Sequence, residues 1–285
     1  MGLMRMDALL VEARRKRMAI GGFECWSSAG ARAIAEAAAE CRMPVIFQAT
    51  RAEYELMGGA AAMKAIVECY VEQAGIDAAL HLDHGASMEE VRTCLDGGFS
   101  SVMLDASRLP LEENIAASSE AAGAAHEASC SIEAELGHVG GFEGDLEEVD
   151  DEQAGLTDPE EAERFVAETG IDCLAVGIGT VHGEYRREPN LDLDRLARIA
   201  DRVPLPLVLH GGSGVTDELL LQAIERGIAK INICTDIHKV WIAAVTAARE
   251  TRTPSLAGRY YEPAQEALKT SIAGIIQKFA NGKSW

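Results

Sequence analysis

Short apolar segments alternate eight times with alanine-, leucine- and glutamate-rich segments along this 285-residue chain, and this alternation restricts the fold more than any other feature. Buried strands of a parallel sheet are almost continuously apolar, as these short segments are. The segments between them keep one face apolar at helical spacing. The eight expected strands are MAIGGFEC (18–25), PVIFQAT (44–50), AALHLDHG (78–85), SSVMLDAS (100–107), CSIEAELG (130–137), CLAVGIGT (173–180), PLVLHGG (206–212) and AKINICTD (229–236).

Eight strand–helix alternations predict a closed parallel (β/α)8 barrel, the TIM barrel of the α/β class. A chain of 285 residues with 48% hydrophobic residues is long enough for one such barrel, so we expect residues 1–285 to form a single domain with a C-terminal helical extension. An open doubly wound sheet is the alternative. No GxGxxG follows the first strand, however, and polar residues recur at the ends of nearly all strands instead of at one switch point.

Charge and cysteine content exclude several classes of partner. The formal net charge of −20 argues against nucleic acid and against an anionic membrane surface as partners. No apolar stretch approaches the roughly 18 residues that a membrane span needs, and the N-terminus lacks the apolar region of a signal peptide. The seven scattered cysteines form an odd number, which favours reduced thiols over a disulfide framework. We therefore expect a cytoplasmic protein.

Three histidines end three of the apolar segments, and each is followed directly by glycine: His84, His182 and His210. A single histidine in such a place is more often a hydrogen-bonded core or surface residue than a ligand. Three at strand ends can converge on one cation, with an open position for substrate and with Asp83 beside it. His126 and His238 are expected to be structural or solvated, whereas His81, inside a strand, is expected in the core or beside a ligand.

Polar and glycine residues also follow the last two strands, and these two segments predict an anion site. The segments are GGSG (211–214) and NICT (232–235), after the last two strands. Glycines there expose backbone N–H groups and hydroxyls add donors, which suits a phosphate at a helix start. The expected binding residues in these segments are Gly211, Gly212, Ser213, Asn232, Ile233, Cys234 and Thr235.

Six ordered motifs carry a family resemblance: HLDHG, SVMLDAS, IEAELG followed by GG, GTVHGEY, LVLHGGSG and KINICTD. Collinear from about residue 78 to residue 236, they resemble the class II, metal-dependent ketose-bisphosphate aldolases, which include fructose- and tagatose-bisphosphate aldolases. The resemblance implies a zinc ion held by the three histidines. It also implies that Asp83 takes the proton from the C4 hydroxyl in cleavage, although an orienting role for Asp83 is the alternative. Gly183, Gly211, Ser213, Asn232 and Thr235 would contact the dihydroxyacetone phosphate half.

Three acidic residues have roles that depend on the resemblance. Asp105 and Glu135 match positions associated with a second or alternative cation, divalent or monovalent, and they suit equally well inward carboxylates bonded to the ligands. Glu143 lies in the acidic, glycine-containing segment 137–158, which is expected to be a mobile lid. By resemblance Glu143 exchanges the C3 proton, whereas residues 147–152 read as a solvated acidic loop.

Two departures from the family pattern concern the aldehyde half. GFECWSS (22–28) stands where the family usually has a segment like AFNVNN, and SLAGRYYEPAQEAL (255–268) stands where many members carry DPR followed by an aromatic residue. The second phosphate therefore lacks its usual arginine, unless Arg259, Arg187 or Arg186 substitutes.

We expect reversible cleavage of a phosphorylated ketose, fructose or tagatose bisphosphate-like, to dihydroxyacetone phosphate and an aldehyde. An aldolase for a related ketose without the second phosphate is the alternative. A metal-dependent barrel hydrolase is a less favoured alternative, because such a barrel would usually show HxH on the first strand and a bridging lysine, and we identify neither in this sequence. A non-catalytic homologue is also less favoured, because it would have lost the acid–base residues Asp83 and Glu143, which are both present. The resemblance also implies a homodimer or homotetramer, with the C-terminal helix ALKTSIAGIIQKFA (267–280) as a natural contact.

Overall fold

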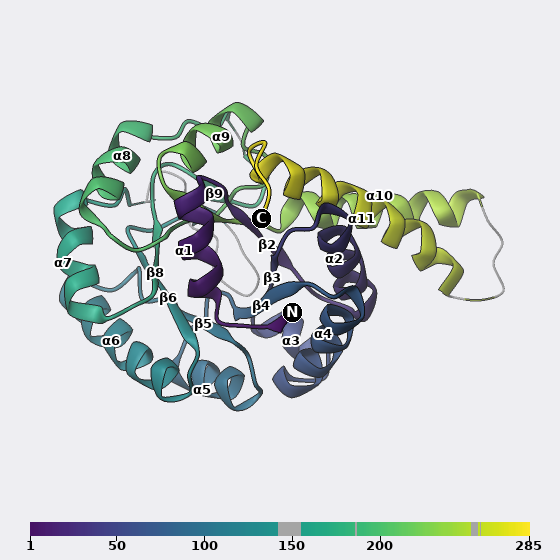
Figure 1. Ribbon diagram of the computed structural model, residues 1–285, viewed down its shortest axis with the longest axis horizontal. Helices are drawn as coiled ribbons and strands as arrows, with labels where there is room; N and C mark the ends of the chain where they lie inside the picture. The colour runs from purple at the N-terminus through teal and green to yellow at the C-terminus, as the bar shows by residue number, and fades with distance from the viewer. Residues whose placement is uncertain (142–154, 186, 252–255, 257) are drawn as a thin grey trace.

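Eight parallel strands form a closed barrel in the computed structural model, which describes residues 1–141, 155–185, 187–251, 256 and 258–285 (Figure 1). The strands pair in chain order, and the barrel closes because the last strand pairs with the first, with Ile233 opposite Phe23. This topology confirms the expected TIM barrel. The strands are β2 (Ile20–Glu24), β3 (Val45–Ala49), β4 (Asp77–Leu82), β5 (Ser101–Leu104), β6 (Ser131–Leu136), β8 (Cys173–Val176), β10 (Leu207–Leu209) and β11 (Ile228–Ile233).

Helices surround the barrel, and most begin at a side-chain cap that the sequence supplies. Asp158 accepts hydrogen bonds from the N–H groups of Glu160 and Glu161, so the helix starts at Pro159. Ser27, Ser87 and Thr216 cap other helices in the same way. The outer helices are α2 (Ser28–Cys41), α3 (Arg51–Leu56), α4 (Ala60–Ala74), α5 (Met88–Asp96), α6 (Leu111–Glu127), α7 (Pro159–Thr169), α8 (Leu193–Arg202) and α9 (Asp217–Glu225).

The amino-terminal end of the barrel is closed by α1 (Met6–Lys16), which lies across the opening in Figure 1. Met6, Leu9 and Leu10 of this helix are almost fully buried against the lower barrel interior, which includes Ile46 and Val208. Burial of each such side chain contributes about 1.5–3 kcal/mol. The preceding β1 (Gly2–Leu3) pairs with the start of β4. A functional pocket in the barrel must therefore open at the carboxyl ends of the strands.

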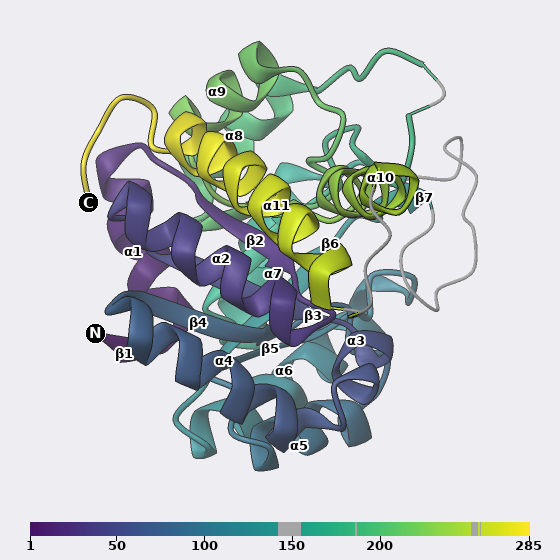
Figure 2. The ribbon, with the colours of Figure 1, turned by 90° about the vertical axis from the view of Figure 1, so that its right-hand side faces the viewer.

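Two long helices complete the chain, α10 (Thr235–Thr251) and α11 (Gly258–Phe279). Figure 1 shows this pair extending to one side of the barrel, and Figure 2 shows α11 beside α2. Leu268, Ile272, Ile276 and Phe279 are buried, so the apolar face of the expected C-terminal helix packs within its own chain. Within the described part of the chain, no helix is both long and apolar enough to cross a membrane.

One of the three histidine-bearing segments differs from a simple strand end. The strand β8 stops at Val176, because two glycines follow and Gly179 adopts a φ of +105° that other residues rarely adopt. His182 consequently lies six residues further on, in β9 (Val181–His182), which pairs with β7 (Gly140–Gly141). A short extra pairing above the barrel, and not the barrel strand itself, holds this histidine.

Candidate functional site

The three histidines predicted from the sequence meet at the carboxyl end of the barrel. The ring centres of His84 and His210 are 4.6 Å apart, and that of His182 is 5.0 Å from His84 and 5.8 Å from His210. One ring nitrogen from each lies within 4.8 Å of the others, and all three residues are buried. His84 has a φ of +46°, an uncommon conformation for a non-glycine residue that is typically retained where function requires it.

Carboxylates fix which nitrogen faces the centre in two of the three rings. Asp105 Oδ2 lies 2.8 Å from His84 Nδ1, and Glu133 Oε1 lies 2.7 Å from His210 Nε2. The other two nitrogens, His84 Nε2 and His210 Nδ1, face each other at 2.8 Å. Rings that both donate to carboxylates would direct two lone pairs at each other here, an arrangement that a bound cation stabilises. The donor set therefore fits a divalent metal of zinc type.

Asp105 and Glu135 form, with His84, a second group of residues that could hold a cation. Glu135 Oε2 is buried, has no hydrogen-bond partner among the described residues, and lies 3.5 Å from His210 Nδ1. Burial and the neighbouring Asp105 charge raise the pKa of Glu135 to about 8. Burial also acts to raise the pKa of Asp105, but the hydrogen bond and charge of His84 and the hydrogen bonds from Ser107 together outweigh burial, and the net shift is downward. The geometry of Asp105 and Glu135 is compatible with a second cation site and also with carboxylates that bond to the histidines.

Asp83 lies at the end of β4, fully buried, directly before His84. Gln48 Nε2 donates to it at 2.9 Å, and Asn232 Nδ2 lies 3.1 Å from each of its oxygens. These amides hold the carboxylate in one orientation beside the histidine cluster. A carboxylate held in this way can accept a hydrogen bond from a substrate hydroxyl group.

A buried ion pair beneath the histidines was missed in the sequence. Lys230 is fully buried on β11 and donates to Glu133 Oε2 at 2.8 Å, while the other oxygen of Glu133 bonds His210. Burial acts to raise the pKa of Glu133, yet the charge of Lys230 and the bond with His210 lower it overall. The alternation of side chains along a strand could have indicated this pair. Glu133 points to the same face of its strand as Glu135, and Lys230 points to the same face as Asn232, so both point into the barrel.

His81 belongs to the same buried layer, as expected. Its Nδ1 lies 2.8 Å from Ser101 Oγ, and its Nε2 lies 3.8 Å from Asp83 and 3.6 Å from Glu133. These three acidic and imidazole groups form a further cluster that could hold a metal. Burial and the Lys230 charge lower the pKa of His81 well below its usual value, which favours the neutral ring.

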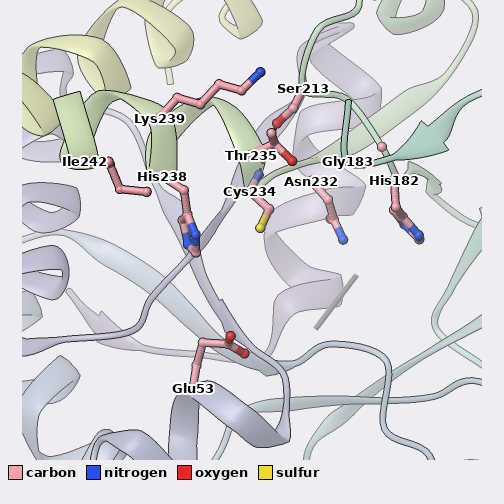
Figure 3. A pocket seen from close by; sticks show the side chains of 11 residues that line it. Glu53, His182, Gly183, Ser213, Asn232, Cys234, Thr235, His238, Lys239 and Ile242 are labelled. Atoms are coloured by element: carbon pink, nitrogen blue, oxygen red, sulfur yellow. Dashed lines mark hydrogen bonds between the residues drawn. The ribbon is translucent and has the colours of Figure 1, made fainter. Parts of the chain in front are cut away.

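A pocket of about 390 Å³ opens beside the histidine cluster (Figure 3). Ser213 Oγ accepts hydrogen bonds from the N–H groups of Cys234 and Asp236, so this hydroxyl caps the start of α10. Gly211 has a φ of +64° and approaches Val181 too closely for a side chain. The described lining residues are Glu53, His182, Gly183, Gly211, Ser213, Asn232, Cys234, Thr235, His238, Lys239 and Ile242.

Most of the expected anion-binding residues line this pocket, with two exceptions among the described residues. The N–H of Gly212 donates to Asn232 O at 3.1 Å, and the Ile233 side chain is buried, so both lie beneath the lining. His238, for which we expected a structural or solvated role, lines the pocket because α10 begins at Thr235 and turns this residue toward the opening. His126 is exposed and pairs with Asp172, as expected for a solvated residue.

Glu143 and residues 147–152 lie outside the described part of the chain, as does Arg186. His138 and Gly155, which stand on either side of Glu143 and residues 147–152 in the sequence, exchange backbone hydrogen bonds of 2.9 and 3.0 Å. These hydrogen bonds return the chain to the rim of the barrel beside the histidine cluster.

Comparisons with known proteins agree with this geometry. The family model described as fructose-bisphosphate aldolase class-II matches residues 4–283. A fructose-bisphosphate aldolase from Geobacillus stearothermophilus is 38% identical over 291 aligned positions, which cover 100% of this chain and 99% of the relative. The crystal structure of the YdjI aldolase from Escherichia coli K12 matches with a TM-score of 0.86 and 31% identity, covering 99% of this chain and 100% of that one. A putative fructose-1,6-biphosphate aldolase from Coccidioides immitis has a TM-score of 0.87 at 30% identity, with 97% and 96% covered.

Proposed function

The chain belongs to the class II fructose-bisphosphate aldolase family and is an aldolase, and from this premise we propose that it is a zinc enzyme that reversibly cleaves a phosphorylated ketose to dihydroxyacetone phosphate and an aldehyde. The observation that carries the proposal is the convergence of His84, His182 and His210, two of them oriented by carboxylates, beside Asp83 and the pocket. We assign the three histidines as the zinc ligands. When bound, zinc supplies Lewis-acid polarisation of the substrate carbonyl and neighbouring hydroxyl oxygens.

Asp83 acts as the general base in cleavage in this proposal. It accepts the proton of the C4 hydroxyl while the C3–C4 bond breaks, so that C4 leaves as the aldehyde carbon. Gln48 and Asn232 donate to Asp83 and keep its carboxylate directed at the substrate. In condensation the same carboxyl group returns the proton. We assign the proton transfer at C3 to Glu143, on the grounds of the family resemblance alone.

The phosphate of the dihydroxyacetone half is held, in this proposal, by the side of the pocket at the start of α10. Ser213, Thr235 and Lys239 present hydroxyl and ammonium groups there, next to Gly183 and Gly211. The N-terminus of a helix favours an anion, which offsets the net charge of −20 over the whole chain. Phosphate binding at this point fixes the distance from the reacting carbons to Asp83.

The wider setting is also part of the proposal. We infer that residues 1–285 act as one domain, since α10 packs on α11, and α11 packs on α2 and on β2 of the barrel. All seven cysteines are free thiols, which supports a cytoplasmic location. We further propose a homodimer or homotetramer, supported by the family resemblance, and a second cation at Asp105 and Glu135, supported by their place beside His84.

A retro-aldol assay tests the proposed reaction. Purified protein is stripped with a chelator, reloaded with zinc, and supplied with ketose mono- and bisphosphates, while dihydroxyacetone phosphate is measured with a coupled dehydrogenase. We expect product formation by the reloaded protein and its loss in the stripped protein. Cleavage that is unchanged by removal of metal would refute the zinc mechanism, and cleavage of none of the phosphorylated ketoses would refute the proposed reaction.

A further inference from the structure

The pocket beside the histidine cluster has two chemically different ends. At one end lie the Ser213 and Thr235 hydroxyls, and Figure 3 shows the Lys239 side chain extending toward Ser213. At the other end the Glu53 carboxylate reaches into the pocket from the opposite wall, and His238 points toward it. His182 and Asn232 lie between them, next to the proposed metal and base. A substrate with its phosphate at the first end must therefore place its aldehyde half beside Glu53.

Glu53 is held in this position by the start of α3. The Thr50 N–H donates to Glu53 Oε2 at 2.9 Å, and the Thr50 hydroxyl donates to the same oxygen. This capping box fixes the side chain from its own helix and keeps a carboxylate at the pocket wall. Both bonds use Oε2, and the carboxylate as a whole faces the opening in Figure 3.

A second acidic residue lies at the same end of the barrel. Glu24 is the last residue of β2, is 1% exposed, and stands opposite Gln48 in the sheet register. Among the described lining residues, Lys239 is the single lysine or arginine, and it lies at the Ser213 end. Its ammonium group pairs with Glu184 at 2.6 Å, on the rim. At the Glu53 end the described lining thus carries a carboxylate and no lysine or arginine.

The wall around His238 is aromatic. The His238 and Trp26 ring centres are 4.2 Å apart, and Trp26 in turn contacts Trp241 with ring centres 6.0 Å apart. An imidazole can donate or accept a hydrogen bond, and a carboxylate accepts strong bonds from hydroxyl groups. Carboxylate, imidazole and indole together suit a chain of CH–OH groups. They do not suit a dianion, which is repelled by like charge.

We propose that Glu53 and His238 make this an aldolase for ketose 1-phosphates whose aldehyde half is an uncharged polyhydroxyl chain without a second phosphate. The inference rests on the proposed aldol cleavage and specifies its substrate class. Glu53 accepts hydrogen bonds from distal hydroxyl groups, and its charge excludes the bisphosphate. His238 provides the facing polar contact, held in place by Trp26.

Matched substrates test the proposal on the zinc-loaded protein. Fructose 1-phosphate and fructose 1,6-bisphosphate differ only at the distal end, as do tagatose 1-phosphate and tagatose 1,6-bisphosphate. We expect kcat/KM for the monophosphate to exceed that for the bisphosphate by on the order of 100-fold in at least one pair, because one like-charge contact is avoided. A bisphosphate that is cleaved as well as or better than its monophosphate in both pairs would overturn the proposal.

Removal of the Glu53 charge tests whether this residue excludes the bisphosphate. Glu53→Gln retains an oxygen that can accept from the Thr50 N–H but removes the charge, and it should raise kcat/KM for the bisphosphate by on the order of 100-fold, or about 2.7 kcal/mol. The monophosphate should lose efficiency, since a neutral acceptor binds hydroxyls less strongly. Glu55→Gln is the control, because Glu55 is exposed on the same helix and pairs with Arg51. An identical response to both changes would overturn the assignment.

Binding separates failure of this inference from failure of the proposed reaction. Calorimetric titration of each ligand into zinc-loaded Asp83→Ala protein reports affinity without turnover. We expect the monophosphate to bind more tightly than the bisphosphate, and Glu53→Gln to narrow the difference. If neither ligand were cleaved by the unmodified protein, the proposed reaction would fail while this measurement still decided the distal preference. Tighter binding of the bisphosphate would refute the proposed preference for an uncharged distal end.

Discussion

Replacement of Lys230 by methionine probes the buried charge layer beneath the histidines. The ammonium group lies 2.8 Å from Glu133 and 3.9 Å from Asp83, and all three side chains are fully buried. Methionine preserves most of the side-chain volume but leaves two buried carboxylates without their cation. Removal of one partner from such a pair costs about 3–5 kcal/mol of the free energy of unfolding.

The expected change in melting temperature follows from the size of the chain. An unfolding entropy of about 2.1 cal/mol/K per residue gives about 0.6 kcal/mol/K for 285 residues, so Lys230→Met should lower Tm by about 5–8 °C. Differential scanning calorimetry at one scan rate measures this change. In the double variant Lys230→Met, Glu133→Leu most of the lost stability should return, because Glu133, the carboxylate nearer to Lys230, is gone, while Asp83 keeps its bonds with Gln48 and Asn232.

The double variant also separates stability from metal binding. It should bind zinc about 10–100-fold more weakly than the unmodified protein, since His210 loses the carboxylate that orients its ring. Competition with a coloured chelator measures this affinity. A fall in Tm of less than about 2 °C for the single variant, equivalent to about 1 kcal/mol, would refute the reasoning about the buried charge.

Three further changes test individual roles. Asp83→Ala should retain zinc but reduce cleavage by about 100–10,000-fold; metal analysis and turnover check this, and zinc loss with normal activity per bound metal would make Asp83 an orienting residue. Glu143→Ala should mainly slow deuterium wash-in at C3 of dihydroxyacetone phosphate, so an unchanged exchange rate would contradict its assignment. Asp105→Asn should weaken zinc binding by about 10–100-fold through His84, whereas unaltered affinity in the chelator competition would separate Asp105 from the metal.

The barrel and the histidine centre could be predicted because their signals are local. Each strand is a short apolar run, and each of His84, His182 and His210 stands before a glycine at the end of such a run. Parallel strands bring these ends to one edge of the barrel, so the convergence followed from the topology alone. The position of His182 in a separate pairing of β7 and β9 did not follow, because two-residue strands carry no periodicity.

Residues that act through contacts between distant strands were harder to find. Lys230 and Glu133 are 97 positions apart in the sequence. Only the alternation of side chains along each strand indicates that both point into the barrel, where they can meet. Glu53 sits in a helix whose charged residues otherwise suggest a solvated face. Its place in the pocket depends on the capping box with Thr50 and on the position of α10, which forms the opposite wall of the pocket (Figure 3). Such relations arise from the packed fold and not from any one segment.

The central claim is that one zinc ion held by three histidines enables cleavage. It is tested most directly by titrating zinc into chelator-stripped protein while bound metal and the rate of ketose phosphate cleavage are measured in the same samples, with His182→Ala protein in parallel. We predict that activity rises in proportion to bound zinc and reaches its maximum at one ion per chain, and that the variant gains little of either. Full activity in stripped protein, or an unimpaired His182→Ala titration, would contradict the claim.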